Sequence, residues 1–158
     1  MNVQIRLLYK EEYPLLREFL YQAIFQKDAS TLIPRSVLDD PQVKVYVEGF
    51  GEKRDDYCLC AEVDTKVIGA VWVRVIDGFG HIDDATPEFA ISLFKQYRGY
   101  GIGTSLMKEM LHYLDERGYQ RSSLAVQKEN YALRLYRSVG FEIIDENEEE
   151  YILTRESR

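Results

Sequence analysis

Residues 91–107 read Ile91-Ser92-Leu93-Phe94-Lys95-Gln96-Tyr97-Arg98-Gly99-Tyr100-Gly101-Ile102-Gly103-Thr104-Ser105-Leu106-Met107. The apolar start is typical of a strand, and the spaced apolar residues from Leu106 onward are typical of an amphipathic helix. Glycines at positions 99, 101 and 103 let the backbone turn sharply between the two. Free amide groups and the positive end of the helix dipole then meet at one point. The stretch therefore predicts an anion site suited to phosphate or pyrophosphate.

Arg98 adds a positive charge beside this loop, but the two common nucleotide motifs do not fit. The dinucleotide fingerprint counted from Gly99 needs a glycine where the chain has Thr104. The Gly-Lys-Ser/Thr of a Walker A loop is absent. The alternative interpretation is a tight strand-to-helix connection in which glycine serves packing only.

The pattern around this stretch predicts strands and helices in alternation. Before it, we expect strands over Val3–Leu7, Tyr57–Val63 and Lys66–Ile76, the last two joined by a hairpin at Asp64-Thr65. Pro14 fits the first turn of one helix, and Asp40-Pro41 begins a second that ends near Gly49, although alternating valines there also suit a strand. After it, we expect a helix end at Gly118, a strand over Ser122–Val126, a helix over Tyr131–Val139 capped by Asn130, and strands over Phe141–Ile144 and Glu150–Thr154.

These elements predict an α/β fold with a mixed sheet. The strands at the two ends of the unit from Phe89 to Val126 must lie parallel, because a helix connects them. No repeat or linker interrupts the sequence, so we expect residues 1–158 to form a single domain.

Composition limits the classes of partner. The 158 residues carry 20 Lys and Arg against 27 Asp and Glu, a net charge of −7, which argues against nucleic acid and anionic membranes. No apolar run approaches the roughly 20 residues of a membrane span, and the start lacks the pattern of a secretory signal, so we expect a cytoplasmic protein. Cys58 and Cys60 share a strand face and are expected as reduced, buried thiols; with His81 and His112 as the only histidines, we expect no metal site.

Two motifs resemble those of the GNAT superfamily of acyl-CoA-dependent N-acetyltransferases. The run from Arg98 to Gly103 resembles the family's R/Q-x-x-G-x-G/A signature, and the run from Gln96 to Gly101 fits it as well. The run from Asn130 to Phe141 resembles the family's N-x-x-A/L-x-x-L-Y-x-x-x-G-F block. The order of elements also matches, so the resemblance covers nearly the whole chain.

The resemblance implies a mostly antiparallel sheet, flanked by helices, whose central parallel pair is splayed to hold acetyl-CoA. The open backbone of Ile91, Ser92 and Leu93 would pair with the pantetheine arm of the coenzyme. Asn130 would bond the same arm, and the Tyr136 hydroxyl would protonate the leaving thiolate. The pyrophosphate would lie on the amides of Arg98, Gly99, Tyr100, Gly101, Ile102, Gly103 and Thr104. From the residues alone, Asn130 also suits a helix cap and Tyr136 a core aromatic.

The incoming amine is mostly protonated at neutral pH, so direct attack needs a base. Glu88 is our candidate, since it begins the strand that carries Leu93, although Pro87 stands where strict alternation places the family's glutamate. A bulge would restore the alignment. The competitors are Asp83, Asp84 and His81, and Glu88 also suits a solvated strand end.

The predicted function is therefore transfer of an acetyl group from acetyl-CoA to a primary amine, on a small molecule or a protein. The alternatives are another acyl-CoA, or an acyl-CoA-binding regulatory module with little turnover. Trp72 and Arg74 share a face and could line the acceptor pocket, with further residues from the stretch 25–50. Exposed terminal strands would support a homodimer.

Overall fold

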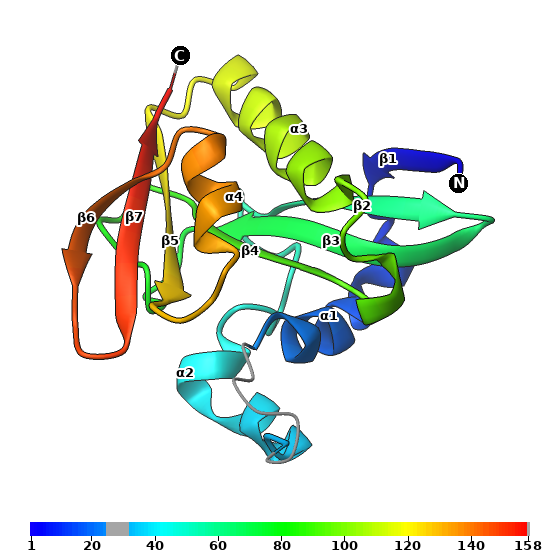
Figure 1. Ribbon diagram of the computed structural model, residues 1–158, viewed down its shortest axis with the longest axis horizontal. Coiled ribbons are helices and arrows are strands. Elements are labelled where there is room, and N and C mark those ends of the chain that lie inside the picture. Colours follow the sequence, from blue (N-terminus) through cyan, green and yellow to red (C-terminus); the bar gives the residue numbers. More distant parts are fainter. Residues whose placement is uncertain (25–31, 158) are drawn as a thin grey trace.

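A seven-stranded sheet organises the computed structural model, which describes residues 1–24 and 32–157. Its strands lie in the order β1-β2-β3-β4-β5-β7-β6, and all neighbours are antiparallel except β4 and β5 (Figure 1). The strands are β1 (Val3–Leu7), β2 (Tyr57–Val63), β3 (Lys66–Arg74), β4 (Glu88–Leu93), β5 (Arg121–Gln127), β6 (Glu142–Glu146) and β7 (Glu150–Glu156). The helices are α1 (Leu16–Ala23), α2 (Pro41–Lys44), α3 (Ile102–Glu116) and α4 (Leu133–Ser138), with short 3-10 helices η1 (Lys10–Leu15), η2 (Arg35–Asp39) and η3 (Lys95–Tyr97). The predicted fold class is confirmed.

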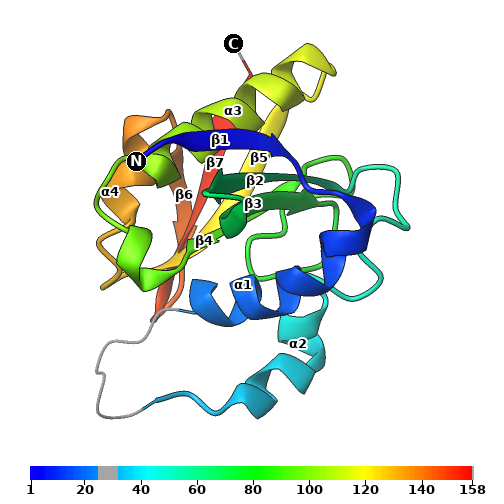
Figure 2. The same ribbon diagram turned by 90° about the vertical axis from the view of Figure 1, so that its right-hand side faces the viewer.

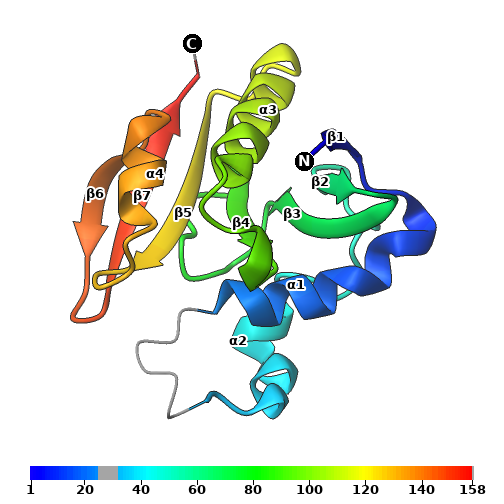
Figure 3. The ribbon, with the colours of Figure 1, turned by 45° about the vertical axis from the view of Figure 1, so that its right-hand side comes forward.

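Helices cover both faces of the sheet, with α3 and α4 on one and α1 and α2 on the other (Figure 2, Figure 3). The predicted apolar side of α3 is buried against β2–β5, with Leu106, Met107 and Met110 fully covered. The opposite face packs α1 against Trp72 and the free, buried thiols of Cys58 and Cys60. In the described part of the chain, no helix is long and apolar enough to cross a membrane.

The parallel pair in the middle of the sheet separates after a single register pair, Glu88 with Ser123. At that end the Ser123 amide donates to the Pro87 carbonyl at 2.9 Å. Further along, β4 remains paired with β3 while β5 remains paired with β7, so the two halves of the sheet diverge (Figure 3). A gap therefore opens between β4 and β5, as the resemblance predicts.

The second predicted helix is shorter than expected. It begins at Asp40-Pro41 as predicted, and the Asp40 side chain caps it by accepting from the Gln42 amide at 2.9 Å. However, α2 ends at Lys44 instead of near Gly49, and the alternative strand does not form. Side chains of β3 bind the carbonyls that a longer helix would use. Trp72 Nε1 donates to the Tyr46 carbonyl at 3.0 Å, and the Arg74 guanidinium donates to those of Val45, Glu48 and Gly49.

Candidate active site

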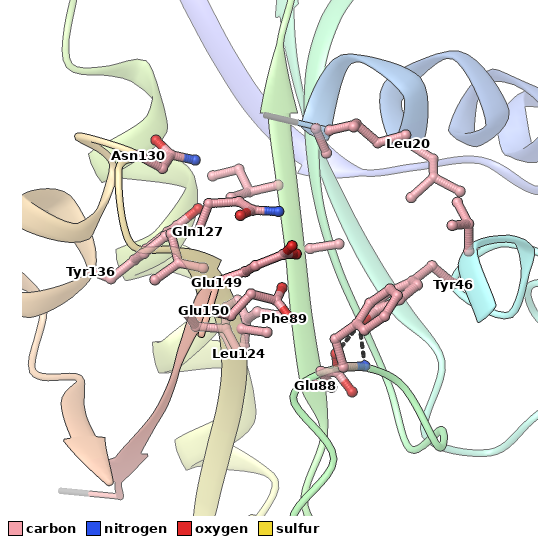
Figure 4. Close-up of a pocket in the computed structure, with 18 of the residues that line it drawn as sticks. Leu20, Tyr46, Glu88, Phe89, Leu124, Gln127, Asn130, Tyr136, Glu149 and Glu150 are labelled. Atoms are coloured by element: carbon pink, nitrogen blue, oxygen red, sulfur yellow. Dashed lines mark hydrogen bonds between the residues drawn. The ribbon is translucent and has the colours of Figure 1, made fainter. Parts of the chain in front are cut away.

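A pocket of about 320 Å³ occupies the gap between β4 and β5. Its lining residues come from both faces of the sheet (Figure 4). On the face of α1 and α2 they are Leu20, Ala23, Ile24, Val37, Val43, Tyr46, Phe79, Glu88 and Ala90; on the other they include Phe89, Ile91, Leu124, Val126 and Tyr136. The pocket therefore has lining residues from both faces of the sheet.

Glu88 lies in this pocket and is only 2% exposed. Its Oε2 accepts hydrogen bonds from the Tyr46 hydroxyl and, at 3.0 Å, from the Gly80 amide. Its Oε1 has no partner among the described residues. Burial raises the pKa of Glu88 to about 7, although these two donors and nearby His81 oppose the rise. A carboxyl group with this pKa and one unpartnered oxygen is suited to accept a proton near neutral pH.

The surroundings of Glu88 differ from the sequence-based alternatives. The side chain is buried, so it is not a solvated strand end. No bulge is present between β3 and β4, because their register is continuous from Arg74–Glu88 to Gly69–Leu93. The carboxylate is instead packed against a backbone turn, since a Cβ at Gly78 would stand 2.6 Å from Glu88 Oε1.

The three competitors for the role of base lie outside the pocket lining. Asp83 pairs with Arg121 at 2.6 Å, which holds the pKa of Asp83 well below its usual range. Asp84 is fully exposed, and His81 uses Nδ1 on the Ile76 carbonyl at 2.8 Å. Of the four sequence candidates, the structure places Glu88 alone in the pocket.

Tyr136 and Asn130 reach the pocket from the side of α4 (Figure 4). Burial raises the pKa of Tyr136 to about 12, so its hydroxyl keeps its proton at neutral pH. The Asn130 side-chain oxygen accepts from the Ala132 amide at 2.9 Å, which is the predicted cap, displaced to the turn before α4. Its side-chain nitrogen points toward the pocket, so the capping bond leaves a donor available there.

The backbone of β4 is partly open toward the gap. The Phe94 amide donates to the Ile68 carbonyl of β3, so by alternation Ser92 also faces β3 while Ile91 and Leu93 direct their N–H and C=O groups toward β5. The Leu93 carbonyl is taken by Arg98 Nε at 3.0 Å. The Ser92 hydroxyl donates to the Phe19 carbonyl at 2.6 Å, and this hydrogen bond fixes α1 to β4.

The glycine loop forms an open cradle in front of α3. Gly99 and Gly101 have φ of 88° and 82°, and a Cβ at either would meet no other atom within 4 Å. The amides from Gly99 to Thr104 donate to no described residue, while the Ser105 amide begins the helical pattern by bonding the Gly101 carbonyl. Such a row of free donors, at the positive end of a 15-residue helix, fits the pyrophosphate of a coenzyme A molecule.

Sequence reasoning missed four polar side chains of the pocket, those of Tyr46, Gln127, Glu149 and Glu150, and misplaced two residues. Tyr46, expected only as a helix residue, bonds Glu88, and Glu149 and Glu150 line the pocket although a run of acidic residues is usually solvated. Trp72 and Arg74 do not line it; they are 1% and 2% exposed and hold the segment that carries Tyr46. The part of the predicted acceptor stretch that the structure describes does contribute, through Val37, Val43 and Tyr46, while residues 25–31 lie outside the described residues.

Comparison with known proteins agrees with the resemblance noted in the sequence. The sequence model of the Acetyltransferase (GNAT) family matches residues 8–141. The chain is 33% identical over 82 residues to a mycothiol acetyltransferase of Thermobifida fusca, covering 49% of this chain and 25% of that protein. It is 36% identical over 64 residues to the [ribosomal protein bS18]-alanine N-acetyltransferase of Haemophilus influenzae, covering 40% and 43%. The matches thus span about a quarter to less than half of these relatives.

Among solved structures, the fold is similar to that of the PaiA N-acetyltransferase of Thermoplasma acidophilum in complex with coenzyme A. The TM-score is 0.70 at 20% identity, over 99% of both chains. This likeness extends beyond the family match to both ends of the chain.

Proposed function

The chain belongs to the GNAT family of acetyltransferases, and on this premise we propose that it transfers the acetyl group of acetyl-CoA to a primary amine by direct attack. The observation that carries the proposal is Glu88, a buried carboxylate with a pKa of about 7 and one unpartnered oxygen, inside a pocket lined from both faces of the sheet. A pure binding module needs no such group. Direct attack needs both substrates present together, which a pocket lined from both faces of the sheet favours.

On the face of α3 and α4, the proposal assigns coenzyme binding to three features. The amides from Gly99 to Thr104 hold the pyrophosphate, with Arg98 beside them. The open groups of Ile91 and the amide of Leu93 pair with the pantetheine arm, and the Asn130 side-chain nitrogen donates to it. Ser92 holds the strand in place. When bound, acetyl-CoA supplies a thioester whose carbonyl carbon is open to attack.

On the opposite face, Glu88 and Tyr46 act on the amine. Glu88 Oε1 accepts the proton that the ammonium must lose before it can attack. The Tyr46 hydroxyl fixes the other oxygen of the carboxylate and so orients it. Across the gap, the Tyr136 hydroxyl donates a proton to the departing sulfur, because its raised pKa keeps it protonated.

Three broader assignments remain part of the proposal. Residues 1–158 form one acyltransferase domain, supported by a sheet whose strands run from Val3 to Glu156. The cytoplasm is the proposed compartment, supported by the free thiols of Cys58 and Cys60. The acceptor is an amine on a small molecule or on a protein.

The direct test is release of the coenzyme thiol when the protein is mixed with acetyl-CoA and a panel of amines. We expect release that depends on the amine, with a matching acetylated product by mass spectrometry. Coenzyme binding with no release for any amine would favour the regulatory module. Faster release with a longer acyl-CoA than with acetyl-CoA would favour another acyl group.

A further inference from the structure

Two additional carboxylates stand in the wall of the pocket. Glu149 and Glu150, where β7 begins, line the pocket, and their side chains point toward its middle (Figure 4). Glu150 pairs with Gln127 in the β5–β7 ladder, and Glu88 pairs with Ser123 on the same strand. Positions 123 and 127 share a face of β5 because side chains alternate along a strand. Glu150 and Glu88 therefore lie on the same face of the sheet, the face of α1 and α2.

Among the described residues, the pocket lining carries negative charge and no positively charged side chain. Its 19 lining residues include three glutamates and no Lys, Arg or His. The nearby Lys128 is committed elsewhere, since its Nζ pairs with Glu146 at 3.1 Å. Burial raises the pKa of Glu150, and the charge of Glu149 adds to the rise. Three carboxylates in one cavity repel one another unless a cation enters.

The chemistry of the cavity favours an organic cation over a metal ion. Within residues 1–24 and 32–157, no three His, Cys, Asp or Glu side chains are placed so that they could share a metal ion. Apolar and aromatic side chains line the same cavity as the carboxylates, among them Leu20, Val43 and Phe79. Buried Glu88 keeps Oε1 unpartnered and provides one end of the site, while Glu149 and Glu150 provide the other.

We propose that the acceptor is an amine that carries a second cationic group, as a diamine or polyamine does, and that Glu149 and Glu150 hold this second group while Glu88 receives the reacting amine. The inference rests on the proposed function and adds the class of substrate. The reacting nitrogen loses its proton, so only one cation remains for the glutamate pair. An acceptor with a carboxylate in that place is repelled.

The test compares three acceptors of six carbon atoms each with the wild-type protein: diaminohexane, hexylamine and aminohexanoate. They differ only in the group at the far end, which is cationic, neutral or anionic. We expect kcat/KM for the diamine to exceed that for hexylamine by about 10-fold to 100-fold, from one charged contact in a partly buried site. Aminohexanoate should fall below hexylamine. Diaminobutane and diamino-octane then measure the distance between the two ends of the site.

Variants locate the effect in the glutamate pair. In the double variant Glu149→Gln, Glu150→Gln, the ratio of kcat/KM for diaminohexane over hexylamine should fall to near one. Glu148→Gln removes the same kind of charge from an exposed neighbouring position outside the pocket lining, and should leave the ratio unchanged. A ratio, unlike a single rate, is not moved by a general loss of folded protein.

The outcomes separate this inference from the function on which it rests. Acetylation of all three acceptors at similar rates, or a preference for aminohexanoate, overturns the dicationic class and leaves the acetyltransferase function intact. An unchanged ratio in the double variant overturns the role of Glu149 and Glu150. Absence of thiol release with every acceptor overturns the proposed function and this inference together.

Discussion

At the scale of single residues, burial sets the protonation of the two side chains to which we assign proton transfer. Removal from water raises the pKa of Glu88 to about 7 and that of Tyr136 to about 12. Burial therefore prepares the two side chains for opposite roles in proton transfer near neutral pH. The carboxyl group is divided between its two protonation states and can accept a proton, while the phenol is fully protonated and can donate one.

Replacing Glu88 by Gln should change the pH dependence of the reaction. Wild-type kcat/KM should rise as pH increases through about 7, because the carboxyl group loses its proton there. The Glu88→Gln variant should lose about 100-fold at neutral pH, and the deficit should shrink toward the amine pKa near 10, where the amine arrives neutral. The measurement is a pH–rate profile with one fixed amine.

The control for this profile is Asp84→Asn, which alters an exposed carboxylate outside the pocket and should leave the curve unchanged. Parallel profiles for wild type and Glu88→Gln would show that Glu88 is not the base.

Replacing Tyr136 by Phe should lower kcat by about 100-fold and weaken coenzyme affinity far less. The ring keeps its packing against Phe141, at 6.5 Å between centroids, while the proton donor is lost. Steady-state kinetics and calorimetric titration with coenzyme A separate the two effects. Tyr131→Phe, at a position 77% exposed on the same segment, should behave as wild type. Full turnover in Tyr136→Phe would leave that side chain a core aromatic only.

Sequence alone could place Glu88 at the start of its strand, but not Tyr46 beside it. The two residues are 42 positions apart and meet where Trp72 and Arg74 hold the segment around Tyr46 against β3. A tertiary contact of this kind leaves no periodic signal. Glu149 and Glu150 were missed for another reason: a run of acidic residues is usually solvated, and the register that places Glu150 opposite Gln127 appears only in the folded sheet.

At the scale of elements, the strand–loop–helix unit around α3 follows closely from sequence. Glycine spacing and an apolar stripe are local signals, so the end of β4, the loop and the buried side of α3 could all be predicted. The end of α2 could not, since the side chains that stop it come from a strand about 30 residues later in the chain.

The glycine cradle should lose its affinity for coenzyme A if a side chain occupies it. Gly101→Leu should abolish measurable coenzyme A binding by calorimetry, because the side chain occupies the open space in front of α3. Gly118→Leu is a matched control, since Gly118 has φ of 81°, equally open space, and a position at the far end of the same helix. Both variants should lose about 1 kcal/mol of stability from positive φ, yet the Gly118→Leu variant alone should keep wild-type affinity. Equal affinities in both variants would remove the phosphate assignment.

At the scale of the whole molecule, the buried carboxylate costs stability. The pKa of Glu88 is raised from 4.5 to about 7 on folding, so the native protein binds more protons than the unfolded chain between these values. Stability is therefore full below about 4.5 and falls as pH rises through about 7. The shift corresponds to about 3 kcal/mol at alkaline pH.

Glu88→Gln should consequently stabilise the protein at pH 8 relative to pH 5, by about 1–3 kcal/mol in the free energy of unfolding. Urea denaturation of both proteins at the two pH values measures this difference. The amide keeps the size of the side chain and still accepts from Tyr46 and Gly80. A difference that stays constant with pH would mean that Glu88 titrates at its ordinary value in the folded protein.

The order of the strands in the sheet could be predicted from the sequence only in part. The class of fold and the parallel pair follow from the helix between Phe89 and Val126. β7 lies between β5 and β6. Its position depends on the packing of the whole sheet, which no local sequence pattern indicates. The same position brings the start of β7 to the pocket.

Trp72 gives the molecule a built-in optical reporter. It is the one tryptophan of the sequence, it is 1% exposed, and its indole N–H bonds the carbonyl of Tyr46. The tryptophan fluorescence of the protein therefore comes from a single indole attached to the segment that orients Glu88. An acceptor that displaces this segment would shift the emission, whereas coenzyme entering from the opposite face would reach it only through the sheet. Occupancy of the acceptor half of the pocket can thus be followed without a label.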